Sequence, residues 1–161
     1  MAGNKATADS KKVAKHLPEG YHTVTPFIIT DKAGDLIIFL KDAFGGKVTY
    51  KLKDKNGEIM HATVKIGDSI IMLAETPENY KPVSCMLYLY VKDVDSTFKK
   101  SIKAGGRSQR EPLDEFYGDR SACVTDNWGN TWWIATHLED LDESEIKSGM
   151  RDTEKQLASK N

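Results

Sequence analysis

The sequence has little of several features that mark specialised classes of protein. Its 161 residues include two cysteines, Cys85 and Cys123, too few for a disulfide framework and without metal-ligand spacing. No apolar run approaches the roughly 18 residues that a membrane helix needs. Lys and Arg (23) nearly balance Asp and Glu (24), so the basic excess of a nucleic-acid-binding protein is missing. We therefore expect a cytoplasmic globular protein that binds neither nucleic acid nor membranes.

Both ends of the chain are charged and poor in apolar residues. Residues 1–19 are rich in lysine and offer little that can be buried, which predicts a flexible tail. Near the other end, Asp142 followed by Glu145 resembles a helix-capping box. Apolar residues at helical spacing come after it, so we expect a C-terminal helix within residues 141–161 that docks weakly on the core.

One pattern occurs twice between these ends. In residues 20–76, a β-branched strand precedes a stretch of helical apolar spacing that closes at Gly45-Gly46, and three further strand-like runs follow. Residues 85–140 repeat the order, with the helix closing at Gly105-Gly106. Residues 77–84 form a proline-containing linker. Each copy indicates a β-α-β-β-β module, and an internal repeat is evidence about architecture, not about activity.

Two such modules predict an α+β fold in which each helix covers one face of a four-stranded sheet. Placed side by side, the sheets would form a half-barrel crevice with the helices on the outside. Along the first strand of the second module, Tyr88 and Tyr90 alternate with Leu87 and Leu89, so they face opposite sides. We expect the leucines under the helix and the tyrosines in a crevice that receives a ligand.

Four segments resemble a known family and occur in that family's order. They are residues 18–26, 66–74, 117–121 and 133–140. With the paired modules, they resemble the vicinal oxygen chelate superfamily, which contains glyoxalase I, extradiol dioxygenases and bleomycin-resistance proteins, and within it the PhnB-like branch. The resemblance covers residues 18–146 and implies a glyoxalase-like fold. A shared fold does not by itself carry the activity.

The resemblance also implies where a divalent metal would bind. Metal-dependent members take one ligand from the first and last strand of each module. The corresponding positions here are Val24 or His22, Ile71, Met86 and Trp133. Isoleucine, methionine and tryptophan offer no hard ligand, and one histidine cannot complete a catalytic zinc site. We therefore expect no metal and no other cofactor.

A different set of side chains would be needed for any metal site. The alternative is an ion held by His22, His61, Glu75 and His137. This alternative requires four residues that are distant in the sequence to converge within coordination distance.

The candidate ligand-binding residues are mostly aromatic. Trp133, Tyr88 and Tyr90 can stack on a flat ligand, or fill the crevice, or face a second chain. Tyr117 either lines the crevice mouth or anchors its loop. His22 lies close to the first strand and is included in the same ligand-binding set.

Arg120 has two interpretations. Its planar guanidinium can pair with a carboxylate or phosphate of a ligand. Alternatively, it forms an internal bridge to Asp119 or Asp126. The sequence leaves both open.

The candidate catalytic residues are His137, Glu75 and His61. A histidine titrates near neutral pH and can act as an acid or base, but at a strand end it more often satisfies backbone groups. The repeat places Glu75 where His137 lies in the second module. The two cysteines are expected to be small buried groups.

The sequence therefore favours a protein that binds a small organic ligand in an aromatic crevice without the superfamily's metal. The alternative is a lyase or isomerase of the same superfamily that uses these histidine and glutamate side chains, with or without a divalent metal. The free edges of the sheets need partners, which predicts a homodimer.

Overall fold

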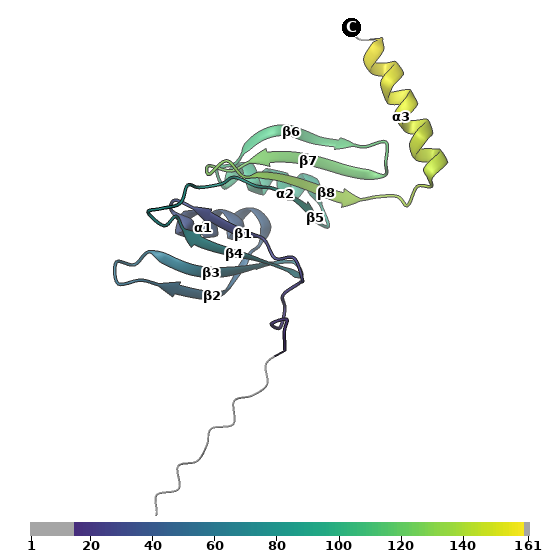
Figure 1. Cartoon of the computed structure of the whole chain (residues 1–161). Coiled ribbons are helices and arrows are strands. Elements are labelled where there is room, and N and C mark those ends of the chain that lie inside the picture. The colour runs from purple at the N-terminus through teal and green to yellow at the C-terminus, as the bar shows by residue number, and fades with distance from the viewer. Residues whose placement is uncertain (1–14, 160–161) are drawn as a thin grey trace, which may run out of the picture.

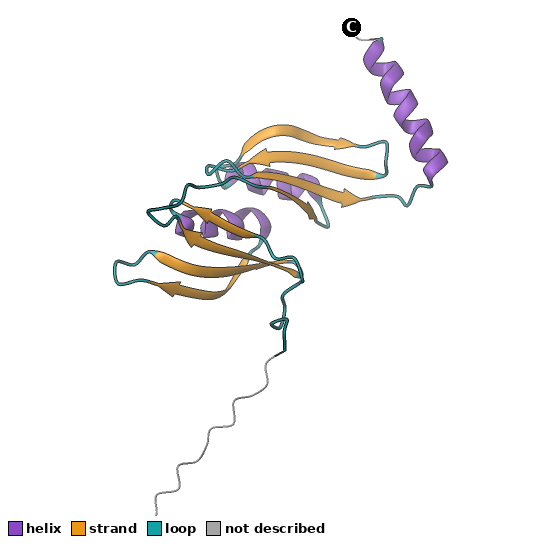
Figure 2. Ribbon diagram, viewed as in Figure 1, coloured by secondary structure: helices purple, strands orange, loops and turns teal. Residues whose placement is uncertain are grey.

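The computed structural model describes residues 15–159, which form two sheets and three helices (Figures 1 and 2). The flexible tail predicted for residues 1–19 lies mostly outside the described residues. Residues 15–19 contain neither helix nor strand. No helix in the described part of the chain is both long and apolar enough to cross a membrane.

The first module has the predicted β-α-β-β-β order. Its elements are β1 (Phe27–Thr30), α1 (Ala33–Phe44), β2 (Lys47–Lys53), β3 (Ile59–Ile66) and β4 (Ser69–Glu75). The strands lie in the order β1-β4-β3-β2, with β1 parallel to β4 and the other pairs antiparallel. Helix α1 ends at Gly45, whose left-handed φ of 69° lets its N–H reach the last helical carbonyl groups.

The second module repeats this topology. Its elements are β5 (Met86–Tyr90), α2 (Val94–Lys103), β6 (Arg107–Asp114), β7 (Asp119–Thr125) and β8 (Thr131–His137). The strand order is β5-β8-β7-β6, with β5 parallel to β8. Helix α2 begins at Asp93, whose carboxylate accepts a hydrogen bond from the Ser96 N–H at 2.9 Å.

The two modules share one core through their helices. α1 and α2 pack against each other in the middle of the molecule, with strands of the two sheets on either side (Figure 1). The ring centroids of Phe44 in α1 and Trp132 in β8 lie 5.0 Å apart. The Phe39 ring of α1 lies close to Gly106, which follows α2. A Cβ added at Gly106 would lie 3.5 Å from the Phe39 ring. The α+β class and the two modules are thus confirmed.

The placement of the helices differs from the half-barrel expected for a single chain. Because α1 and α2 contact each other, the helix-covered faces of the sheets turn toward the shared core. The helices therefore lie at the centre of one chain, and each sheet's helix-free face points away from that core. The physical reason is that α1 is apolar on two sides: Leu36 and Leu40 are fully buried, and Phe39 is 3% exposed.

The third helix, α3 (Glu143–Ala158), confirms the predicted capping box. The carboxylate of Asp142 accepts a hydrogen bond from the Glu145 N–H at 3.0 Å, and the Glu145 carboxylate accepts one from the Asp142 N–H at 2.8 Å. The helix projects away from both sheets (Figure 1). Gly149 contacts Phe116 in the β6–β7 turn, where an added Cβ would lie 3.1 Å from the Phe116 backbone oxygen.

Candidate functional site

The helix-free face of the second sheet carries three neighbouring aromatic side chains. Leu87 and Leu89 pack on the core, so strand alternation turns Tyr88 and Tyr90 to the opposite face, as predicted. Tyr88 lies directly beside Trp133 of β8, with ring planes parallel to within 6° and centroids 6.3 Å apart. The Tyr88 and Tyr90 rings lie 5.3 Å apart. We call Tyr88, Tyr90 and Trp133 the aromatic platform.

A buried carboxylate holds the edge of this platform. Asp119, only 4% exposed, accepts hydrogen bonds from the Tyr90 hydroxyl at 3.0 Å and, at the longer distance of 3.5 Å, from that of Tyr88. Burial and a hydrogen bond with Tyr117 raise the pKa of Tyr88, and the hydrogen bond to Asp119 raises the pKa of Tyr90. Both phenols therefore stay protonated and fixed in orientation.

His137 is bound by carboxylates at both ring nitrogens. Its Nδ1 lies 2.7 Å from Asp119 and its Nε2 lies 3.0 Å from Asp140. These two contacts favour the imidazolium form and raise the pKa of His137. In this arrangement neither nitrogen is free to take a proton from a substrate, so the geometry favours a cross-link at the end of β8.

Arg110 is a site residue that the sequence reasoning missed. Its guanidinium carbon lies 4.8 Å from the centre of the Trp133 ring, a cation–π distance. It donates to the Ser121 hydroxyl at 2.7 Å and pairs with Glu115, whose side chain is 11% exposed. Strand pairing directs Arg110 there, because it pairs with Cys123 on the strand next to Trp133, and the register shifts in β6 on either side of Arg110 hide this from the sequence.

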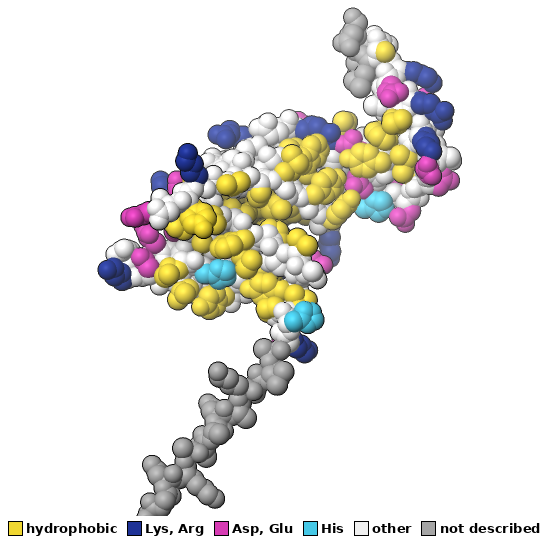
Figure 3. Space-filling view, viewed as in Figure 1, with side chains coloured by type: hydrophobic (Ala, Val, Ile, Leu, Met, Phe, Trp, Pro, Cys, Tyr) yellow, Lys and Arg dark blue, Asp and Glu magenta, His cyan; other side chains and the backbone are white. Residues whose placement is uncertain are grey.

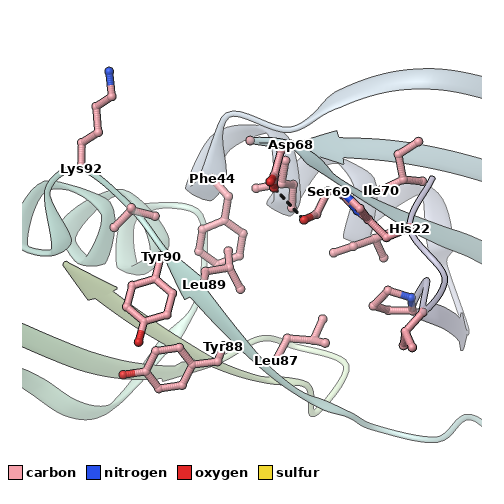
Figure 4. A pocket seen from close by; sticks show the side chains of 16 residues that line it. His22, Phe44, Asp68, Ser69, Ile70, Leu87, Tyr88, Leu89, Tyr90 and Lys92 are labelled. Atoms are coloured by element: carbon pink, nitrogen blue, oxygen red, sulfur yellow. Dashed lines mark hydrogen bonds between the residues drawn. The ribbon is translucent and has the colours of Figure 1, made fainter. Parts of the chain in front are cut away.

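A cleft of about 780 Å³ lies on the other side of β5 (Figure 4). It separates β5 from the residues before β1 and from the start of β4, and its wall is largely apolar, with Phe44 and Leu89 at its centre. His22 and Asp68 lie at its rim. A hydrogen bond from Ser69 at 2.8 Å is the main cause of the lowered Asp68 pKa, and the charge of His22 adds to it.

The structure thus brings most of the predicted ligand-binding residues to one region. Tyr88 and Tyr90 belong to both the platform and the cleft, because β5 forms the boundary between them. His22 lies in the cleft, and Tyr117 lies against the platform beside Tyr88.

Arg120 lies on the opposite side of the sheet, which corrects the prediction that it binds ligand. Its guanidinium donates to Asp95 of α2 at 2.7 and 2.9 Å and to Asp114 of β6 at 2.7 Å. The internal bridge foreseen as the alternative does form, but with these partners and not with Asp119 or Asp126. Arg120 faces the helix because it alternates with Asp119, which faces the platform.

The candidate catalytic residues do not converge. Glu75 lies in the first sheet opposite Thr30, and His61 lies near Phe27 and Tyr50 at 5.7 and 6.1 Å between ring centroids. His137 belongs to the second sheet. Within residues 15–159, no group of three His, Cys, Asp or Glu side chains could hold a metal ion. The alternative metal set of His22, His61, Glu75 and His137 is therefore not assembled.

The β7–β8 turn is one residue longer than the β3–β4 turn, so counting along the repeat pairs Ile71 with Trp133 and Glu75 with His137 incorrectly. Two residues separate the paired Ile66 and Ser69, but three separate the equivalent Asp126 and Asn130, whose backbones also bond. The shift reverses the faces of β8 relative to β4. Ile71 consequently packs on the core with Leu73, although its counterpart by counting, Trp133, faces the platform. Glu75 and His137 are displaced in the same way.

Both cysteines are buried or half-buried free thiols, as expected. Cys123 is 4% exposed and lies beside Trp133, and Cys85 is half-buried. Burial is the main cause of the raised pKa of each thiol. Both therefore remain protonated at neutral pH and act as small packing groups.

The chain is similar to proteins from several bacteria. The uncharacterized protein Mb0911c from Mycobacterium bovis is 25% identical over 138 residues, which cover 79% of this chain and 91% of that protein. The crystal structure of TioX from Micromonospora sp. ML1 has a TM-score of 0.62 at 25% identity, covering 71% of this chain and 98% of TioX.

A second solved structure shows the same fold. A glyoxalase/bleomycin resistance protein/dioxygenase family enzyme from Burkholderia phytofirmans PsJN has a TM-score of 0.60 at 17% identity, covering 71% of this chain and 97% of that one. The family profile of the Glyoxalase/Bleomycin resistance protein/Dioxygenase superfamily matches residues 21–134, which span both modules up to β8. The chain belongs to the glyoxalase/bleomycin resistance protein/dioxygenase superfamily.

Proposed function

We propose that this protein binds a flat organic molecule on the aromatic platform and that it does so without a metal. The observation that supports the proposal is the parallel pair of rings formed by Tyr88, which is 46% exposed, and Trp133, which is partly exposed, since planar aromatic surfaces favour offset stacking. The neighbouring cleft has the volume of a small-molecule site. In the second module, Met86 and Trp133 stand at the ligand positions that the superfamily resemblance implies, and neither supplies a hard donor.

We propose further that the site is completed in a homodimer. Strands β1 and β5 are the end strands of their sheets, and each leaves one edge without a strand partner among the described residues. Exposed apolar side chains lie on β5, where Met86 is 68% exposed and Tyr90 66%. Figure 3 shows apolar side chains gathered over the middle of the visible face. A second copy would cover this surface and close the platform.

The lyase or isomerase alternative has less support from the geometry. Its candidate residues, His61, Glu75 and His137, lie in two different sheets, and both nitrogens of His137 are bound by carboxylates. Binding and sequestration of a ligand need only the platform and the cleft.

The proposal is tested by titrating the full chain with flavone, acridine and anthraquinone while following tryptophan fluorescence. We expect at least one compound to bind and Tyr88→Ala and Trp133→Ala each to weaken its binding about five-fold, because stacking contributes about 1 kcal/mol per ring. Tyr50→Ala is the matched control, since Tyr50 is an exposed aromatic residue outside the platform and outside both cavities. Equal binding by all three variants contradicts the proposal.

A further inference from the structure

A second cavity lies at the far end of the first sheet, away from the platform. It has a volume of about 450 Å³ and lies between the ends of β1 and β4, the start of β3 and the linker that follows β4. None of its lining residues belongs to the platform or the cleft. Its occupancy is therefore a separate question from the proposed function.

The floor of this cavity is apolar and partly aromatic. Ile29 and Ala74 line it, and Phe27 and Tyr80, which are 49% and 64% exposed, supply ring surfaces. Such a floor stabilises a bound hydrocarbon or aromatic group by removing it from water. The same rings favour a cation, because the faces of aromatic rings carry negative potential.

The charged residues that line the cavity are all acidic. Asp54, Glu58 and Glu75 lie along it, and no lysine, arginine or histidine does. None of the three forms an ion pair within residues 15–159. The Asp54 carboxylate caps the β2–β3 turn by accepting hydrogen bonds from the Asn56 and Glu58 N–H groups at 2.8 and 2.9 Å.

A buried hydroxyl without a partner supplies the third observation. Thr76 lines the cavity, and its Oγ1 is buried with no hydrogen-bond partner. A buried polar atom of this kind costs free energy unless something bonds to it. An N–H donor in the cavity would meet that need, since a hydroxyl oxygen accepts hydrogen bonds.

We infer that this cavity binds an amphiphilic amine in its ammonium form, with its aromatic or alkyl group on the apolar floor. The ammonium group lies toward the carboxylates of Glu58 and Glu75 and donates to Thr76. An anion is disfavoured by the three carboxylates. A neutral molecule of the same shape gains only the apolar contact.

The test is an NMR titration of ¹⁵N-labelled full-length protein at neutral pH with 2-phenylethylammonium, 3-phenylpropionate and 2-phenylethanol. These probes share the aromatic group and differ in charge. We expect shifts at the amides of Ile29, Ala74 and Thr76, and about five-fold tighter binding of the ammonium than of the alcohol. Binding of the carboxylate as tight as that of the ammonium overturns the inference, and so do shifts confined to β5 and β8 or no binding at all.

Variants separate charge from packing. Glu58→Gln with Glu75→Gln should weaken ammonium binding about five-fold and leave the alcohol unchanged, because only the ammonium uses the charges. Thr76→Val, which keeps the side chain's shape, should also weaken the ammonium. Glu154→Gln in α3 is the matched charge control. If the doubly substituted protein binds the ammonium as tightly as the Glu154→Gln protein, the inference fails.

Discussion

The buried carboxylate of Asp126 sets the geometry of the β7–β8 turn and offers a sharp test of the fold. Its side chain is fully buried and accepts four hydrogen bonds, each 2.9 Å long. Oδ1 accepts from the backbone N–H groups of Trp128 and Asn130. Oδ2 accepts from the Asn130 side-chain amide and from the Trp132 indole. The turn therefore fixes where β8 begins and which face Trp133 takes.

Asp126→Asn keeps the shape of the side chain but replaces one acceptor oxygen with an NH₂ group. That group would face two N–H donors, which lose their acceptor inside the protein. Each buried donor left unpaired costs about 1–3 kcal/mol, so we expect unfolding to become about 2–5 kcal/mol easier. For a chain of this size, that corresponds to a fall in Tm of about 6–15 °C.

Urea unfolding followed by circular dichroism measures this loss, and a double-mutant cycle checks its cause. Trp132→Phe removes one of the two donors that face the new NH₂ group, so Asp126→Asn should cost about 1 kcal/mol less in that background than in the parent chain. A loss below about 1 kcal/mol for the single Asp126→Asn variant would refute the reasoning, because it would mean that the turn rearranges without penalty.

Four further predictions follow from the site and its surroundings. The pKa of His137 is raised in the folded state, so the parent chain should be more stable than His137→Gln at low pH. This difference in stability should be complete below about pH 6.5 and should disappear as the pH rises through the folded pKa, as measured by urea unfolding at several pH values. Arg120→Ala should lower Tm while leaving the affinity for planar probes unchanged, since its partners Asp95 and Asp114 lie away from the platform. Gly118→Ala should destabilise the chain by about 1–3 kcal/mol in urea, because its φ is 90° and the new Cβ would lie 2.3 Å from the Glu139 carbonyl oxygen. Calorimetric titration of tag-free protein with Zn²⁺, Mn²⁺ and Ni²⁺ should give no stoichiometric binding, and one tight ion per chain would contradict the metal-free site.

The fold could be predicted from the sequence because its signals are local. The glycine pairs ended both helices where they were expected, and the alternation of Tyr88 with Leu87 and Leu89 gave the correct face. The packing of the modules could not be predicted, because it depends on the second apolar side of α1. Phe39 and Phe44 have ordinary core spacing, and nothing local shows that they pack against the other module.

The site was predicted in part for a similar reason. Residue type and strand register sufficed for Tyr88, Tyr90 and Trp133. The partners of Arg120 were not predicted because Asp95, in α2, is 25 residues away in the sequence. Only the tertiary structure brings the two side chains together. Arg110 was overlooked because β6 has bulges on either side of it, which hide the alternation that directs it toward Trp133.

The central position of α1 and α2 has a consequence for inheritance. A gene fragment that encoded either module alone would produce a chain with half of the shared core open to water, with Trp132 or Phe39 uncovered. The two copies, although they follow the same plan, therefore depend on each other to bury this core.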